Sequence, residues 1–292
     1  MQSTDVVVGV DGSPASLAAL RWAADEAARR GGALRILTAY RWTWPETLAA
    51  PTGAAEQAAR EQAEQVAARA AAAARAADPN LPVSCAAVPG GAAEVLLPGA
   101  ICGALLVVGS RGHGELTAAL LGSVGNQVAT HATGPVAVVR GRTDTATGPV
   151  VVGMDGTPAA DSILATAFDL AAARRCALTA VRAFTAPVGP WSVELPPFPY
   201  DREARRTELD QGLRQQVTRW AEKYPEVPVE VMVRSGETAN ILVAASRQAQ
   251  LMVLGSRSHG GFAGLLLGSV SAHLIHHADC PVLIARPSAP TS

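Results

Sequence analysis

Lysine is almost absent from this sequence. Of its 24 basic residues only Lys223 is a lysine, and no glycine loop surrounds it. A Walker A phosphate loop requires a lysine after its glycines, and Schiff-base catalysis requires a lysine as the nucleophile. The sequence therefore argues against both kinds of site.

The sequence also lacks a strong charge, aromatic side chains and long apolar runs. The formal net charge is −1 and aromatic residues make up 4%, so neither a nucleic acid nor an anionic membrane is expected as partner. No apolar run is long enough for a membrane span, and no signal peptide is recognisable at residues 1–5. We expect a cytoplasmic protein. The four cysteines, none in a Cys-x-x-Cys pair, are expected to be reduced and buried.

A duplication organises the 292 residues. The segment Val150–Pro158 repeats the pattern of Val6–Pro14, and the segment after Gly255 repeats the pattern after Gly109. The polar stretch 143–148 reads as a linker. The sequence therefore predicts two domains, 1–142 and 149–286, and a disordered tail, 287–292.

Strand and helix patterns alternate in each copy. In the first copy we expect strands near 5–10, 33–40, 83–88, 104–108 and 135–140, and helices near 14–29, 54–77, 92–97 and 123–132. Ser13 before Pro14 is the expected helix N-cap. Such alternation predicts an α/β fold with a doubly wound parallel sheet in each copy and helices on both of its faces.

A glycine tract follows the apolar run Ala104–Val108. Its pattern is Gly109, two residues, Gly112, nine residues, then Gly122-Ser123. Glycine lets the backbone approach a ligand closely, and amides at a helix start bind phosphate without a lysine. The tract recurs from Gly255, with Ser258 where the first copy has Gly112. We expect one phosphate site in each copy, at the carboxyl ends of the strands.

Several residues near the tracts have two interpretations. Arg111 and Arg257 pair either with phosphate or with surface carboxylates. His113 is either a ligand contact or a solvated loop histidine. The aspartates that follow the first strands, Asp11 and Asp155, either contact ligand or initiate turns. The histidines at 273 and 277 have helical spacing, but no third metal ligand is evident beside them.

Taken together, the tract, the segment Val8–Ser13 and the closing Gly-Pro-Val and Cys-Pro-Val strands resemble the universal stress protein family, over nearly the whole chain and twice. The resemblance is to tandem members of the ATP-binding branch. It implies a five-stranded parallel sheet per domain, related to adenine-nucleotide α-hydrolases. It also implies that the two aspartates face adenosine, that Ala39 and Ala183 contact adenine through the backbone, and that the tracts hold ribose and phosphates.

Motifs and resemblance together give a set of candidate nucleotide-binding residues. In the first copy they are Asp11, Gly12, Ala39, Gly109, Arg111, Gly112, His113, Gly122, Ser123 and Val124. In the second copy they are Asp155, Gly156, Ala183, Gly255, Arg257, Ser258, Gly268, Ser269 and Val270.

The expected function is nucleotide-dependent regulation in a stress response, with ATP and Mg²⁺ as ligands and a protein partner that the sequence does not identify. No acid or lysine in the tracts is placed for efficient phosphoryl transfer, so we expect at most slow ATP hydrolysis. The alternatives are an ATPase or nucleotidyl-transfer enzyme, a flavodoxin-like redox module and an interaction scaffold with degenerate sites. The resemblance implies a pseudo-dimer of the two copies through strands 135–140 and 281–286. A homodimer is a further option.

Overall fold

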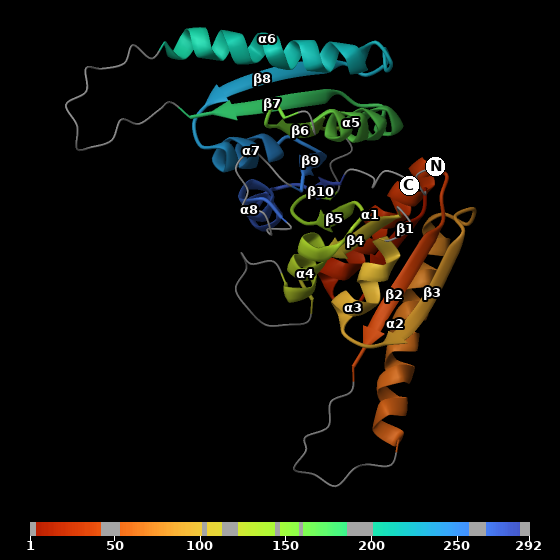
Figure 1. Ribbon diagram of the computed structural model, residues 1–292. Coiled ribbons are helices and arrows are strands. Elements are labelled where there is room, and N and C mark those ends of the chain that lie inside the picture. Colours follow the sequence, from red (N-terminus) through yellow and green to blue (C-terminus); the bar gives the residue numbers. More distant parts are fainter. Residues whose placement is uncertain are drawn as a thin grey trace, which may run out of the picture. The chain divides into compact units, whose positions relative to one another are not determined.

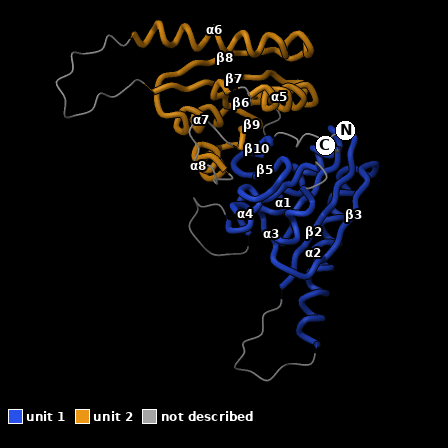
Figure 2. Tube along the Cα trace, viewed as in Figure 1, with its two compact units in different colours: residues 1–143, 281–292 blue, residues 144–280 orange. Residues whose placement is uncertain are grey.

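The computed structural model describes residues 4–41, 53–100, 104–112, 122–143, 147–157, 160–185, 201–256 and 267–286 (Figure 1). The chain forms two compact units (Figure 2). Unit 1 comprises Met1–Thr143 with Pro281–Ser292, and unit 2 comprises Asp144–Cys280. The last strand of the second copy therefore belongs to unit 1.

Unit 1 contains a sheet in the order β3-β2-β1-β4-β5-β10. All neighbours are parallel except β5 and β10. Its elements are β1 (Val6–Gly9), α1 (Pro14–Arg30), β2 (Leu34–Tyr40), α2 (Ala54–Ala77), β3 (Val83–Pro89), α3 (Ala92–Leu96), the 3-10 turn η1 (Leu97–Ala100), β4 (Leu105–Gly109), α4 (Ser123–His131), β5 (Val136–Val139) and β10 (Val282–Ala285).

Helices cover both faces of the unit 1 sheet. Helices α1 and α2 contact each other and lie on one face, whereas α3 and α4 lie on the other. The inner strands β1, β4 and β5 are apolar along their whole length, since an inner strand of a parallel sheet is buried on both faces. Leu105, Leu106 and Val107 are accordingly fully buried. This arrangement confirms the doubly wound fold.

The ends of α1 follow from local sequence signals. Ser13 is the N-cap, and its side chain accepts a hydrogen bond from the amide of Ser16. Gly31 ends the helix with a φ of 62°, a left-handed conformation that costs glycine little. The sequence prediction of this cap is confirmed.

Unit 2 repeats the same order of elements around the strands β9-β6-β7-β8, which are all parallel. Helices α5 and α6 contact each other on one face, and α7 lies on the other. Its elements are β6 (Val150–Met154), α5 (Ala160–Arg174), β7 (Leu178–Phe184), α6 (Arg202–Ala221), β8 (Val229–Ser235), α7 (Thr238–Ser246), β9 (Leu251–Gly255) and α8 (Ser269–His277).

Within unit 1, β10 pairs antiparallel with β5, with Leu283 opposite Ala137. The guanidinium of Arg286 extends this contact, since Nη2 donates to the carbonyl of Ala129 at 2.5 Å. The pairing of the last strands of the two copies was expected from the resemblance. A pseudo-dimer of complete copies stays a prediction.

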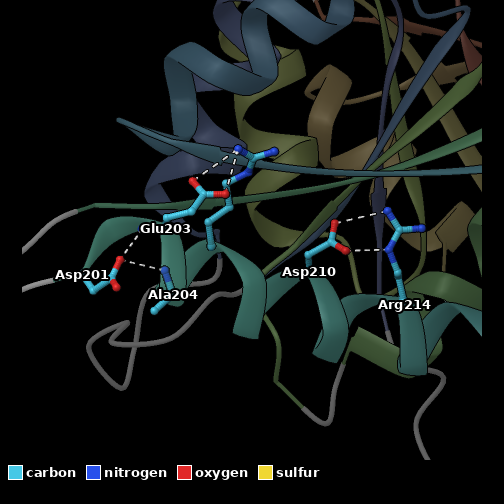
Figure 3. Close-up of polar contacts among 6 residues, drawn as sticks. Asp201, Glu203, Ala204, Asp210 and Arg214 are labelled. Atoms are coloured by element: carbon cyan, nitrogen blue, oxygen red, sulfur yellow. Dashed lines mark hydrogen bonds and ion pairs between the residues drawn. The ribbon is translucent and has the colours of Figure 1, made fainter.

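Helix α6 has polar contacts between its own residues along its length (Figure 3). The N-cap Asp201 accepts from the amides of Glu203 and Ala204 at 3.0 and 2.9 Å. Arg214 then pairs with Asp210 one turn earlier, at 2.5 Å. Each exposed pair of this kind contributes only about 0.3–0.5 kcal/mol. The helix is therefore fixed to unit 2 by its buried residues, Leu209, Leu213 and Val217.

Tyr224, which follows α6, joins that helix to α5. Its ring stacks on Phe168 with centroids 5.4 Å apart, and its hydroxyl donates to Asp169 Oδ1 at 2.5 Å. The hydrogen bond to Asp169, aided by burial, raises the pKa of Tyr224 to about 12. The folded state thus prefers the neutral phenol.

This raised pKa predicts a loss of stability in alkali. An unfolded tyrosine ionises near pH 10, so the contribution of Tyr224 is complete below about pH 10 and is lost towards about pH 12. The variant Tyr224→Phe has no ionisable hydroxyl and serves as the reference. The difference in unfolding free energy between wild type and variant is expected to be smaller at about pH 11 than at about pH 8. Urea unfolding at both pH values measures it. An unchanged difference would contradict the proposed hydrogen bond.

Two further expectations have structural outcomes. Cys280 is buried as expected, but Cys85 is exposed, because it lies on the edge strand β3. In the described ranges, no helix is both long enough and apolar enough to cross a membrane. The predicted tail 287–292 and His113, Arg257 and Ser258 lie outside the described residues.

A candidate nucleotide site at the carboxyl ends of the strands

The turn after β1 holds Asp11 close to the glycine tract. Asp11 Oδ1 accepts from the amide of Ser13 at 2.9 Å, as an Asx turn does. The other carboxylate oxygen faces Gly112, where a Cβ would lie 2.6 Å from Oδ2. The turn therefore places the Asp11 carboxylate beside the tract, so the two sequence interpretations of Asp11 are compatible.

The tract closes on itself at Gly122, whose amide donates to the carbonyl of Ser110 at 2.9 Å. This bond brings the two ends of the tract together. A Cβ at Gly122 would lie 3.5 Å from Arg111 Cα, which is ordinary contact. Gly109 differs, because a Cβ there would lie 2.7 Å from the carbonyl oxygen of Ala15. Helix packing explains the glycine at 109, whereas nothing in the described protein requires one at 122.

Gly122 is the N-cap of helix α4, and no side chain among the described residues caps this helix start. Its first amides, including those of Ser123 and Val124, lack intrahelical acceptors, as at every helix start. The helix dipole adds partial positive charge at this end. The start of α4 is therefore suited to hold an anionic group.

A pocket of about 510 Å³ lies beside this helix start. It is formed where β2 and β3 end and where α3 and α4 begin. The lining residues are Ala39, Arg41, Gly90, Gly91, Ala92, Ala93, Glu94, Ser123, Val124 and Gln127. Of the sequence candidates, the pocket thus brings together Ala39, Ser123 and Val124.

The loop after β3 and its neighbour Arg41 were not predicted from the sequence to line a site. Gly90 and Gly91 follow the third strand directly, so the rule that ligands bind at the carboxyl ends of strands could have identified them. Arg41 carried no such signal. Its Nη2 lies 3.4 Å from Glu94 Oε2, a contact between residues 53 positions apart.

Unit 2 has a related but altered site. Asp155 again follows a first strand, and Oδ1 accepts from the amide and the hydroxyl of Thr157 at 2.9 and 2.8 Å. The amide of Gly268 donates to the carbonyl of Ser256 at 2.7 Å. Gly268 is the N-cap of α8, and Ser269 is its first residue, which matches the start of α4. Ala183 lies in β7, as Ala39 lies in β2.

The difference in unit 2 is a guanidinium beside Asp155. A Cβ at Gly156 would lie 2.6 Å from Arg182 Cζ. The pKa of Arg182 is lowered, mainly by burial and further by the positive charge of Arg205. The negative charges of Asp155 and Glu208 act in the opposite direction. The equivalent residue in unit 1 is Thr38, which is buried. The two units therefore differ at this strand position, where unit 2 has an arginine and unit 1 has a neutral threonine.

The histidines of α8 form no metal centre in the part of the chain that is described. The rings of His273 and His277 have centroids 4.3 Å apart. No group of three or more histidine, cysteine or acidic residues is gathered closely enough there to hold a metal ion.

Comparisons with known proteins identify the family. The model of the universal stress protein family matches residues 3–140 and again residues 147–286. A universal stress protein of Mycobacterium tuberculosis (strain ATCC 25618 / H37Rv) is 37% identical over 297 residues, which cover 97% of each chain. A relative in Mycolicibacterium smegmatis (strain ATCC 700084 / mc(2)155) is 33% identical over 293 residues, with 97% of each chain covered.

Solved structures support the same fold. The crystal structure of a universal stress protein from Archaeoglobus fulgidus DSM 4304 aligns with a TM-score of 0.71 at 19% identity, over 99% of this chain and 100% of that chain. A protein of Pseudomonas aeruginosa PAO1 described as functionally unknown aligns with a TM-score of 0.64 at 14% identity, over 98% and 93%. By its two family matches and its full-length relatives, the chain belongs to the universal stress protein family, as a member with two such domains in tandem.

Proposed function

We propose that this protein binds an adenine nucleotide, ATP with Mg²⁺, in unit 1 and acts in the cytoplasm as a nucleotide-dependent regulator of a stress response. The observation that carries the proposal is the pocket of about 510 Å³ between the ends of β2 and β3 and the start of α4. Pockets for small ligands span about 300–1,000 Å³, and the volume of this pocket lies in that range.

The residues present suit a nucleotide. The amides at the start of α4 can hold phosphate, and the bare Gly122 lets phosphate approach the backbone. The Asp11 carboxylate, beside Gly112, is an acceptor for ribose hydroxyl groups. The described residues offer no cluster of metal ligands, so Mg²⁺ would be held by phosphates and water.

Regulation is favoured over efficient catalysis by the composition of the pocket. Among the described lining residues Glu94 is the one carboxylate, and its Oε2 is engaged by Arg41 and by the amide of Gly91. Phosphoryl transfer requires a positioned base and charge neutralisation near the transferred group. Slow ATP hydrolysis is the alternative that an experiment must separate from binding.

The test combines two measurements on the freshly purified full-length chain. Mass spectrometry identifies small molecules released on denaturation, and calorimetric titration with ATP and Mg²⁺ measures binding. We expect a carried adenine nucleotide or saturable ATP binding, with no steady formation of ADP or AMP. Turnover would favour the enzyme alternative. If no nucleotide is released and ATP does not bind, the proposal is overturned in favour of an interaction scaffold.

A further inference from the structure

A weak ion pair lies at the rim of the unit 1 pocket. Arg41 follows β2 directly, and its Nη2 lies 3.4 Å from Glu94 Oε2. The same oxygen accepts from the amide of Gly91 at 3.0 Å. Gly91 lacks a side chain where Arg41 Nη2 lies, so the guanidinium rests on the backbone at the start of α3. The pair thus places the Arg41 guanidinium at the rim of the pocket.

This pair orients the cation without holding it strongly. The side chains of Arg41 and Glu94 are 59% and 75% exposed, and exposed pairs of this length contribute at most about 1 kcal/mol. A terminal phosphate is a stronger partner for this guanidinium than Glu94, because it carries between one and two negative charges and can accept two parallel hydrogen bonds. Glu94 Oε2 makes one long contact with Arg41 Nη2 and also accepts from the amide of Gly91. An anionic ligand can therefore draw Arg41 away from Glu94.

Unit 2 has a different set of residues at the equivalent rim. Thr185 follows β7 as Arg41 follows β2. The loop geometry is the same in both units, because Gly236 donates to Phe184 and Gly90 to Tyr40, each at 2.9 Å.

In that loop Glu237 occupies the place of Gly91, and Asn240 the place of Glu94. Asn240 Nδ2 donates to Glu237 Oε2 at 2.6 Å. At the rim of unit 2, the neutral Thr185 therefore stands in the place of the cation Arg41. The other two positions carry a carboxylate and an amide, Glu237 and Asn240.

We propose that Arg41 is a specificity-determining residue that selects phosphate-bearing nucleotides in unit 1, and that unit 2 lacks this selection. The proposal rests on nucleotide binding in unit 1. On binding, the Arg41 guanidinium leaves Glu94 and pairs with ligand phosphate, opposite the amides of Ser123 and Val124 in the same pocket.

The experiment compares adenosine with AMP in calorimetric titrations of the full-length chain. Arg41→Thr, which installs the residue found in unit 2, is expected to weaken AMP binding at one site about tenfold, the effect of losing a charge-assisted hydrogen bond. Adenosine affinity is expected to stay unchanged. Arg69→Thr on the exposed face of α2 is the matched control, since it removes the same charge far from the pocket.

A second variant tests the release of Arg41. Glu94→Gln keeps an acceptor for the amide of Gly91 but removes the negative charge, so it is expected to tighten AMP binding about two- to fivefold. Equal effects of Arg41→Thr on AMP and adenosine, or no effect on either, would overturn the role of Arg41 while nucleotide binding stands. A wild-type chain that binds neither AMP nor adenosine, and also fails to bind ATP with Mg²⁺, would overturn nucleotide binding and this proposal with it.

Discussion

Replacing Gly122 with alanine is expected to weaken ATP binding about tenfold or more, with little change in stability. A Cβ at this position would meet only ordinary contacts inside the protein, and Gly122 has a φ of −63°, which alanine adopts freely. The methyl group would instead enter the space beside the first amides of α4. Losing a charge-assisted hydrogen bond there costs about 1.5–3 kcal/mol, whereas a poorer N-cap costs about 0.5–1 kcal/mol of stability.

Two other glycines serve as controls for this prediction. Gly212→Ala in α6 has nothing within 4 Å of its new Cβ, so binding is expected to stay at the wild-type level. Gly109→Ala places a Cβ 2.7 Å from the Ala15 carbonyl oxygen and is expected to lower the unfolding free energy. Calorimetry with ATP and urea unfolding measure both quantities. Unchanged ATP affinity in Gly122→Ala would show that phosphate does not approach the start of α4.

Replacing Phe168 with alanine is expected to lower the stability of unit 2 by about 3–5 kcal/mol, the usual cost of removing a buried phenylalanine ring. Phe168 is fully buried in α5 and stacks on Tyr224. Its removal would leave a cavity and would also deprive Tyr224 of its ring contact. The equivalent residue in unit 1 is Ala24, which carries no ring.

Hydrogen exchange read by mass spectrometry measures this effect separately in each unit. The amides of α5, β6 and β7 are expected to lose protection, while those of β1 and β4 keep it. Leu17→Ala is the control, because Leu17 is 37% exposed on α1 and its truncation leaves no cavity. A uniform loss of protection in both units would contradict the expectation that the cores are independent.

The elements were predictable because their signals are local. The apolar run Ala104–Val108, the Ser13-Pro14 helix start and the glycines after α1 each correspond to an observed boundary. The boundary between the two compact units was harder to predict from the sequence. Strand β10 is the last strand of the second copy in sequence, yet it belongs to the compact unit in which it pairs with β5. No periodicity in the sequence reports which partner such a strand has.

The candidate site was predicted in part. Ala39, Ser123 and Val124 follow from the resemblance, and they line the pocket. Arg41 and Glu94 escaped notice because their contact depends on how the loops after β2 and β3 approach each other, and neither residue belongs to a motif. Arg182 was missed for the same reason, since only the folded strand shows its guanidinium at Gly156. Ligand binding by the candidates stays a prediction.

The pairing of β10 with β5 has a consequence for synthesis on the ribosome. Strand β5 ends at Val139, whereas β10 begins at Val282. At typical elongation rates the intervening segment takes roughly 7–30 s to make, and an unpaired strand edge can recruit other chains. A nascent chain whose first copy has already folded therefore exposes the edge of β5 throughout that interval. Translational pausing before Val282 would lengthen this exposure.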